Sequence, residues 1–213
     1  MHQFRRFMSN CVFKSQRKLL RQSFSSSKWI STVEQPPSEG IQFSIPNGNL
    51  GQPTYHTHPH LISEGHLTCG VTQIEYKDRR TTLMTKLMAE VGNALNNHII
   101  VIPAAQKLYM SDKIPYVFRQ NSDFFYLTGC MEPAAILVLI KPAQTDNYKS
   151  MLFVHDKDSH AELWEGPRTG CGAAVDLFAV DEALPVDDFH EFITQLTSSV
   201  RPRTLWYHKD NPV

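Results

Sequence analysis

Three stretches of this chain carry residue types that bind metals or cofactors in other proteins, beginning with a histidine cluster. His56, His58 and His60 alternate along the sequence, so an extended backbone would place three imidazoles on one side, as a metal site requires. Metal sites also need fixed geometry and supporting hydrogen bonds, which a Pro-containing segment provides poorly. We therefore predict that this tract binds no metal, with a histidine metal site as the alternative.

The other two stretches are fragments of known motifs. Residues 190–194, HEFIT, begin like the zinc-protease helix, but Thr194 stands where the second histidine ligand belongs. Residues 169–175, TGCGAAV, begin like a dinucleotide-binding loop, but Val175 occupies the third small-residue position and no clear strand precedes them. We interpret both as structural. The sequence also has no nucleophile elbow and no P-loop, so we predict no catalytic residue, no metal ligand and no bound cofactor in this chain.

The elements that position these residues follow from hydrophobic periodicity. Thr72 and Glu75 form a capping box, and apolar residues then repeat at helical spacing to Gly92, which predicts one amphipathic helix. Further helices are predicted at 173–178 and 188–196. Short apolar runs predict strands at 98–102, 124–127, 135–140, 151–154 and 204–207. The second, third and fourth runs are separated by short loops and predict an antiparallel meander. Strands interleaved with helices predict an α/β fold, a mixed sheet with helices on both faces.

Charge divides the chain into two parts. Seven of the 21 basic residues precede Glu34 and no acidic residue does, so the rest of the chain carries 14 basic against 21 acidic residues. Residues 1–33 are rich in Arg and Ser, which is typical of a mitochondrial transit peptide. The alternative is a basic tail that binds RNA or nothing. The acidic body disfavours a nucleic-acid partner because it offers no sustained contact surface for phosphates.

The remaining composition bounds the architecture. A length of 213 residues with 41% hydrophobic residues is enough for one domain and a tail. Residues 34–65, with five prolines among Gly, Asn and Ser, predict an irregular, extended arm, which leaves 66–213 for the folded domain. No apolar run approaches the roughly eighteen residues that span a bilayer. Three of the four cysteines lie beyond the leader, and this odd number disfavours a disulfide framework.

One stretch identifies a family. Residues 119–133, RQNSDFFYLTGCMEP, resemble the signature of the N-terminal domain of aminopeptidase P, the Xaa-Pro aminopeptidases. Four further blocks follow in the order and spacing expected of that domain, at 135–140, 152–158, 162–170 and 180–184. Upstream, residues 50–61 and 73–80 resemble the lead-in of the mitochondrial Xaa-Pro aminopeptidase 3 type. The resemblance covers roughly residues 50–207 and implies a three-layer α/β domain.

The resemblance also implies what this chain lacks. In the family, two metal ions, usually manganese, are held by two Asp, one His and two Glu of a separate catalytic domain, where they polarise the scissile carbonyl and supply a metal-bound hydroxide. None of those motif positions occurs in this sequence. We therefore expect a non-catalytic domain of a metallo-exopeptidase of the mitochondrial matrix that removes the residue preceding Pro. Alternatives are a natural short form acting as a binding or regulatory subunit, and a stand-alone domain with an unrecognised hydrolase activity.

The block at 162–170 supplies the candidate site residues. Gly166 and Pro167 force a turn directly after Trp164, and an indole at a turn flanked by Glu165 and Arg168 is suited to anchoring a partner. The resemblance implies that Trp164, with Arg168, lies near the substrate or a subunit interface, and that the partner is a second copy or the full-length enzyme. The alternative is a Trp partly buried at the domain edge.

The family also carries an acidic residue before the signature, usually in an Asn-Asp pair. Here Asp112 is followed by Lys113. We therefore carry no substrate-facing role over to Asp112.

Overall fold

A computed structural model describes residues 45–91, 97–112, 114–143, 145–198 and 203–208. The predicted transit peptide, residues 1–33, lies outside these ranges. Among the described helices, none is long and apolar enough to cross a membrane.

The core of the fold is a five-stranded mixed sheet in the order β8-β7-β6-β3-β9. Its strands are β3 (Asn97–Pro103), β6 (Ile136–Lys141), β7 (Lys149–Val154), β8 (Glu182–Pro185) and β9 (Arg203–Tyr207). The three central strands pair antiparallel, with Ile100 opposite Leu139 and Val138 opposite Met151. The two edge strands pair parallel to their neighbours, as segments that follow a helical crossover do.

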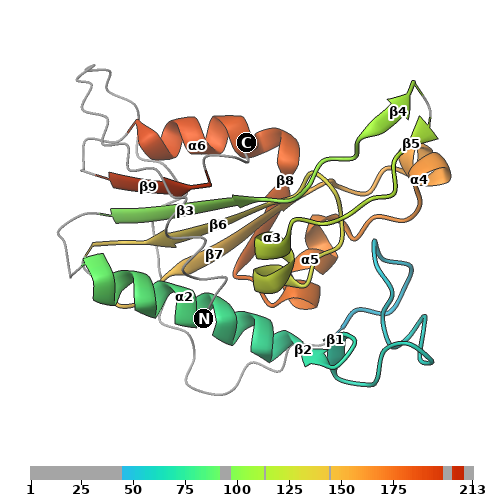
Figure 1. The fold of residues 1–213 in the computed structure, drawn as a ribbon, viewed down its shortest axis with the longest axis horizontal. Helices are drawn as coiled ribbons and strands as arrows, with labels where there is room; N and C mark the ends of the chain where they lie inside the picture. The colour runs from blue at the N-terminus through green and yellow to red at the C-terminus, as the bar shows by residue number, and fades with distance from the viewer. Residues whose placement is uncertain (1–44, 92–96, 113, 144, 199–202, 209–213) are drawn as a thin grey trace.

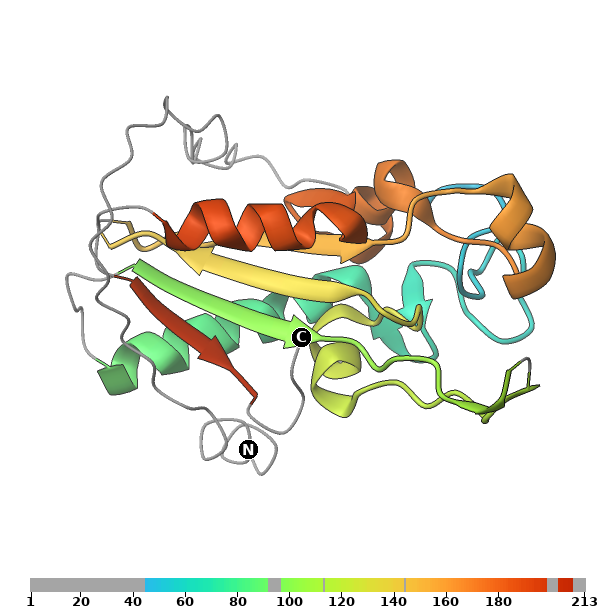
Figure 2. The same ribbon diagram turned by 90° about the horizontal axis from the view of Figure 1, so that it is seen from above.

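Helices cover both faces of this sheet, which confirms the predicted three-layer α/β architecture (Figures 1 and 2). One face carries α2 (Gln73–Val91), α3 (Ser122–Thr128) and α5 (Gly170–Phe178), and the other carries α6 (Phe189–Thr197), which follows the short 3-10 turn η1 (Val186–Asp188). Each face has its own core. The larger core includes Leu87, Phe124 and Phe178, and the smaller one includes Phe153 and Phe192.

Smaller elements sit at the ends of the sheet. They are β1 (His66–Thr68) with β2 (Val71–Thr72), β4 (Tyr109–Ser111) with β5 (Ile114–Pro115), and α4 (Ser159–Glu165). The β4–β5 hairpin and α4 both project beyond the end of the sheet to which β3 and β7 lead (Figure 1). They are the protruding part of this domain.

The predicted helices at 72–92, 173–178 and 188–196 are confirmed. Thr72 Oγ1 accepts a hydrogen bond from the Glu75 backbone N–H at 3.2 Å, and the predicted apolar face of α2 is buried. The helix near 173 starts earlier than predicted, at Gly170, and α6 covers Phe189–Thr197.

The strand predicted at 124–127 is wrong, because these residues form helix α3. The Asn121 side chain accepts hydrogen bonds from the backbone N–H groups of Asp123 and Phe124, which caps the first turn. Gly129 ends the helix in the left-handed conformation. Phe124 and Leu127 are buried at helical spacing. Local capping therefore outweighs the β propensity of the aromatic run, and the predicted meander gives way to a sheet in which β6 pairs with β3 and β7.

Residues 45–65 contain no helix and no strand, as predicted, but they do not form an extended arm. They run through a series of turns, and the backbone N–H of His58 donates to the Thr54 carbonyl at 2.7 Å. Ile45 and Leu50 are buried in the larger core. The sequence pattern concealed this packing because isolated apolar residues in an irregular segment have no periodicity.

Candidate interaction surface

The signature segment at 119–133 is held at both ends by one amide side chain. Gln120 Oε1 accepts hydrogen bonds from the backbone N–H groups of Ala105 and Asn121, each at 2.8 Å. Its Nε2 donates to the Glu132 carbonyl at 2.8 Å and to the Cys130 carbonyl at 3.3 Å. Gln120 thus joins the start of the segment, its end and the exit of β3, which is a structural role for a signature residue.

The glycine of the signature is required by close packing. Gly129 has a φ of 69°, and a Cβ built on it would lie 2.7 Å from the Tyr76 ring and 2.8 Å from the Leu67 side chain. Any larger residue would combine a left-handed backbone with a steric clash. The last turn of α3 therefore docks directly onto α2 and β1.

A fully buried arginine of α2 holds the carboxyl ends of two helices. Arg80 Nη1 donates to the Leu127 carbonyl of α3 at 2.9 Å, and Nη2 donates to the Phe178 and Ala179 carbonyls at the end of α5. Burial lowers the pKa of Arg80, while nearby Tyr148 and Asp181 oppose that shift. A cation at helix C-termini is favourable because the last carbonyls and the helix dipole are both negative there. Sequence reasoning missed this residue, although a charge on the predicted apolar face of α2 was the available signal.

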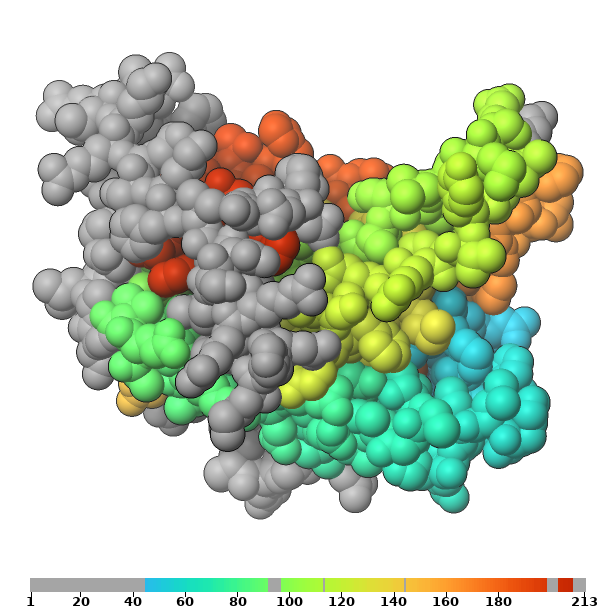
Figure 3. All heavy atoms as spheres, viewed as in Figure 1, coloured from blue at the N-terminus to red at the C-terminus, as the bar shows by residue number. Residues whose placement is uncertain are grey.

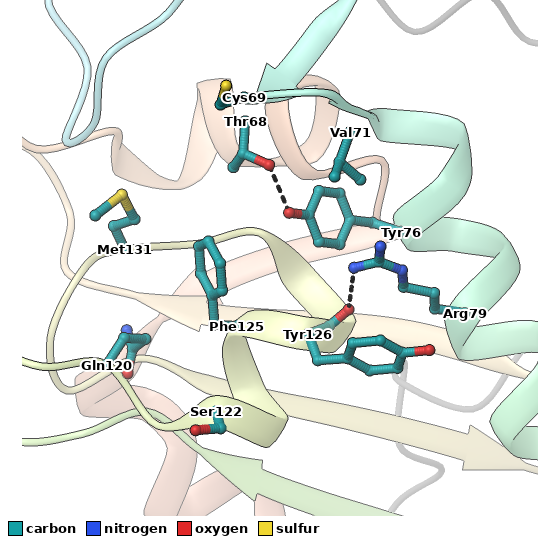
Figure 4. A pocket seen from close by; sticks show the side chains of 10 residues that line it. All are labelled: Thr68, Cys69, Val71, Tyr76, Arg79, Gln120, Ser122, Phe125, Tyr126 and Met131. Carbon is teal, nitrogen blue, oxygen red and sulfur yellow. Dashed lines mark hydrogen bonds between the residues drawn. The ribbon is translucent and has the colours of Figure 1, made fainter. Parts of the chain in front are cut away.

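A hollow lies between the β1–β2 turn, α2 and α3, and its volume is about 610 Å³ (Figure 4). Arg79 crosses it, 4.5 Å from the Tyr126 ring centre and 4.9 Å from that of Tyr76, and donates to the Tyr126 carbonyl at 3.2 Å. This hollow was not predictable from the sequence pattern, because the strand predicted at 124–127 replaces the helix that forms one of its walls. Its lining combines signature residues with the β1–β2 turn: Thr68, Cys69, Val71, Tyr76, Arg79, Gln120, Ser122, Phe125, Tyr126 and Met131.

Trp164 lies on the last turn of α4, and its side chain is largely exposed. Asp158 caps α4 by accepting hydrogen bonds from the backbone N–H groups of His160 and Ala161, and these bonds lower the pKa of its carboxyl. Gly166, with a φ of 92°, ends the helix. Trp164 is 79% exposed and Leu163 is 77% exposed. The side chain is therefore not half-buried at the domain edge.

Arg168 folds the chain after Trp164 back onto α4. Its Nη2 donates to Glu165 Oε2 at 3.0 Å, its Nη1 donates to the Asp156 carbonyl at 3.3 Å, and its backbone N–H donates to Glu162 Oε1 at 2.9 Å. The hydrogen bond from Arg168 lowers the pKa of Glu165, with a smaller contribution from Lys107. Burial and the nearby Arg168 lower the pKa of His155 at the end of β7. Arg168 thus shapes the Trp164 loop, which we define as residues 159–169.

The β4–β5 hairpin lies beside the Trp164 loop at this end of the molecule (Figure 3). The hairpin and the residues next to it carry a second group of exposed apolar side chains. Val117 is 97% exposed, and Asp112, at the hairpin turn, is exposed as well. We call the hairpin and the Trp164 loop together the distal surface. Its exposed apolar residues are Leu108, Tyr109, Met110, Ile114, Tyr116, Val117, Leu163 and Trp164. A group of exposed apolar side chains of this kind is typical of a protein contact site.

The histidine cluster does not form a metal site within the described structure. His58 and His60 have ring centres 5.8 Å apart, while His56 Nε2 lies 3.2 Å from the Ile45 carbonyl oxygen. Across the residues that the structure describes, no group of three His, Cys, Asp or Glu side chains could hold a metal ion. The residues that the structure describes therefore do not fit a two-metal centre, which the family resemblance assigns to a separate catalytic domain.

The two motif fragments lie in helices. His190 and Thr194 are on α6, where Thr194 Oγ1 donates to the His190 carbonyl at 2.7 Å. Gly170 and Gly172 form the first turn of α5. A dinucleotide-binding loop follows a strand, whereas residues 169–175 follow helix α4.

The comparison with known proteins decides the family. A family model described as aminopeptidase P, N-terminal domain, matches residues 76–206. The chain belongs to this family. As an aminopeptidase P N-terminal domain, it has the three-layer fold and the signature segment in the expected places, which confirms the family and fold that the sequence indicated.

Several curated proteins are similar to this chain in sequence. Xaa-Pro aminopeptidase 3 of Mus musculus is 42% identical over 166 residues, which cover 76% of this chain and 32% of the relative. Mitochondrial intermediate cleaving peptidase 55 of Arabidopsis thaliana is 34% identical over 148 residues, which cover 70% of this chain and 28% of the relative. This chain therefore spans about a third of its curated relatives, and one of them is named as mitochondrial.

Solved structures agree. Proline aminopeptidase P II from Yersinia pestis superimposes with a TM-score of 0.52 at 40% identity, over 59% of this chain and 27% of that one. The low-pH form of Escherichia coli aminopeptidase P gives the same TM-score and coverage at 33% identity. This aminopeptidase P N-terminal domain therefore resembles the solved structures in fold as well as in sequence.

Proposed function

We propose that this chain acts as the non-catalytic N-terminal domain of a mitochondrial Xaa-Pro aminopeptidase. In this role it supports oligomerisation and encloses the active site of a neighbouring subunit, while the peptide bond before Pro is cleaved by a manganese-dependent catalytic domain. The observation that carries the proposal is the distal surface, where Trp164 is 79% exposed on a loop shaped by Arg168. Exposed aromatic and arginine side chains are the residue types that dominate protein interfaces.

The electrostatics of the loop favour binding over catalysis. Arg168 is engaged by Glu165 and by the Asp156 carbonyl, so it orders the loop that carries Trp164. Trp164 and Leu163 are exposed beside polar residues of the same loop, including Ser159, His160 and Glu165. Such a surface can exclude water from a bound peptide, but the described side chains around it supply no nucleophile paired with a base.

A chimera tests this proposal. The chain would replace the matched residues of mouse Xaa-Pro aminopeptidase 3, and the assembly mass and the kinetics on an Xaa-Pro peptide would be measured with Mn²⁺. We expect the unsubstituted chimera to be an active oligomer. Its Trp164→Ala variant should have a higher KM and a smaller assembly mass. The 213-residue chain alone should show no turnover. Leu61→Ala is the matched control, because Leu61 is an exposed apolar residue of the 45–65 segment. Turnover by the isolated chain, or an unchanged mass and KM for Trp164→Ala, would contradict the proposal.

Location in the mitochondrial matrix is part of the proposal. It is supported by the composition of residues 1–33 and by the mitochondrial name of the Arabidopsis relative. An import experiment tests this location. The labelled chain would be imported into isolated mitochondria and treated with protease before and after rupture of the inner membrane. We expect protection until the inner membrane is opened, and loss of import when residues 1–33 are deleted.

A binding subunit is the second candidate. Both faces of the sheet are covered by helices of this chain and each face has its own core, which favours a domain that folds without a catalytic partner. In that case the distal surface would bind a full-length enzyme and change its activity. Adding the chain to the full-length mouse relative separates the two roles, since only a regulatory subunit should alter turnover when supplied separately.

A further inference from the structure

The segment before β1 contacts the Trp164 loop although the two lie far apart in sequence and the family match begins only at residue 76. The backbone N–H of Gly51 donates to Thr169 Oγ1 at 3.1 Å. Gln52 Oε1 accepts from the Met131 backbone N–H at 2.9 Å, and Leu50 is buried in the larger core. Residues 49–52, which we call the strap, therefore lie against both the signature segment and the end of the Trp164 loop.

A buried carboxyl group joins the three segments. Glu132 is almost fully buried, and its Oε1 accepts a hydrogen bond from the Thr169 backbone N–H at 3.1 Å. A Cβ built on Gly51 would lie 2.2 Å from the same oxygen, so the strap backbone passes directly over the Glu132 side chain. Thr169 consequently has its N–H bound to the signature segment and its hydroxyl bound to the strap.

The loop has little else to fix its position. None of the seven residues of α4, all of which the structure describes, is buried. Arg168 and Glu162 tie the loop mainly to itself, and Thr169 is the first buried residue after Trp164. An element without a buried face is stabilised chiefly by its end contacts. The placement of the indole therefore depends on the two ends of the loop, which are the segment after β7, where Arg168 donates to the Asp156 carbonyl, and Thr169.

We propose that Glu132 is a positioning residue and that Gly51, through the strap, completes the anchor that fixes the Trp164 loop. The placement of the loop follows from this contact set alone, whereas its effect on peptide hydrolysis rests on the function proposed above. A consequence is that the strap must remain after any removal of the leader, because a new terminus beyond residue 51 would leave Thr169 Oγ1 without its donor.

Amide hydrogen exchange of the full chain tests the anchor. In Glu132→Leu, the Thr169 N–H loses its acceptor, and we expect peptides covering 159–170 to exchange about tenfold faster, equivalent to about 1.4 kcal/mol. Peptides covering β6 and β7 should be unchanged and serve as the internal control for folding. Glu132→Gln keeps an acceptor oxygen and should restore slow exchange, whereas Gly51→Ala should resemble Glu132→Leu.

The outcomes that overturn the proposal are specific. Unchanged exchange of 159–170 in both Glu132→Leu and Gly51→Ala would show that neither residue holds the loop. If Glu132→Leu also accelerates exchange in β6 and β7, Thr169→Val provides the second test, because it removes the hydroxyl that accepts from Gly51 but keeps the backbone N–H that donates to Glu132. If exchange accelerates only at residues 159–170 in Thr169→Val, the result supports the anchor. If exchange there does not change, the result rejects the role of the strap.

Kinetics of the mouse chimera distinguish this inference from the proposed function. If both hold, Glu132→Leu raises KM, leaves kcat nearly unchanged, and Glu132→Gln rescues KM. If exchange of 159–170 accelerates but KM does not change, the anchor stands and the enclosing role of Trp164 fails.

Discussion

The signature segment is held by internal hydrogen bonds and close packing, whereas the distal surface is largely exposed. In the signature segment, Gln120 holds both ends, Asn121 caps α3, and Gly129 packs so closely on Tyr76 that no side chain fits. On the distal surface, Val117 and Trp164 are largely exposed and α4 buries no residue. The stretch that identifies the family therefore serves internal packing. It also positions the neighbouring distal surface, which is suited to binding a partner.

The largest expected effect comes from removing the buried cation that joins α3 to α5. Arg80→Met should lower the free energy of unfolding by about 3 kcal/mol, because buried carbonyls at two helix ends lose their donors. Urea unfolding of the full chain, followed by circular dichroism, measures this. Arg80→Lys keeps the charge but cannot reach both helix ends, so an intermediate loss is expected. A loss below about 1 kcal/mol for Arg80→Met would contradict the stated role of Arg80.

Alanine substitutions at two glycines with similar backbone angles distinguish the stability cost of a steric clash from that of backbone strain. Gly129 and Gly70 have φ values of 69° and 76°, but only Gly129 has neighbours within 4 Å of a built Cβ. Gly70→Ala should cost about 1 kcal/mol for the left-handed backbone. Gly129→Ala should cost at least about 1 kcal/mol more, since Tyr76 and Leu67 must also move. Equal losses in thermal unfolding would show that the signature glycine is needed only for its backbone conformation.

The pH dependence of stability reports on the anchor carboxyl. Burial raises the pKa of Glu132 above its unfolded value, so the unfolded state ionises first as pH rises. The wild-type domain therefore loses stability relative to Glu132→Gln as pH rises from the ordinary glutamate pKa through the raised one, and the difference is constant above that window. Urea unfolding at several pH values checks this, with the exposed Glu64→Gln as the control. A stability advantage of Glu132→Gln that shrinks with rising pH would reverse the sign of the prediction.

The smallest effect on stability is expected at the distal surface. Trp164→Ala should change the free energy of unfolding by no more than about 0.5 kcal/mol, because the indole is 79% exposed. The same substitution should lower the assembly mass of the mouse chimera in sedimentation velocity. A large loss of stability in the isolated chain would place Trp164 with the packing residues and remove the contrast between the two regions.

Periodic patterns made much of the fold predictable. Helices α2 and α6 and strands β3, β6, β7 and β9 follow from apolar residues at regular spacing. The missed helix α3 has only seven residues, so its aromatic run satisfied the strand pattern, and the deciding signals were the Asn121 cap and Gly129. The helix cap at Asn121 and the glycine at 129 therefore indicate α3 better than the β propensity of its aromatic residues does.

The candidate site was predictable only in part. The turn at Gly166 and Pro167 indicated where Trp164 would be displayed, because turn chemistry is local. The anchor was not predictable from local sequence, since Gly51 and Thr169 are 118 positions apart and meet only through the tertiary fold. The exposed hairpin was equally hidden, because exposure depends on what the rest of the fold leaves uncovered.

The contrast between the two regions can be tested in one experiment. Hydrogen exchange would be compared between the isolated full chain and the same residues in the mouse chimera. If the distal surface meets another subunit or domain, residues 108–117 and 159–168 become protected in the chimera, while residues 120–132 change little because their bonds lie within this domain. Unchanged exchange at the distal surface, with new protection confined to the signature segment, would contradict the assignment of partner contact to the distal surface.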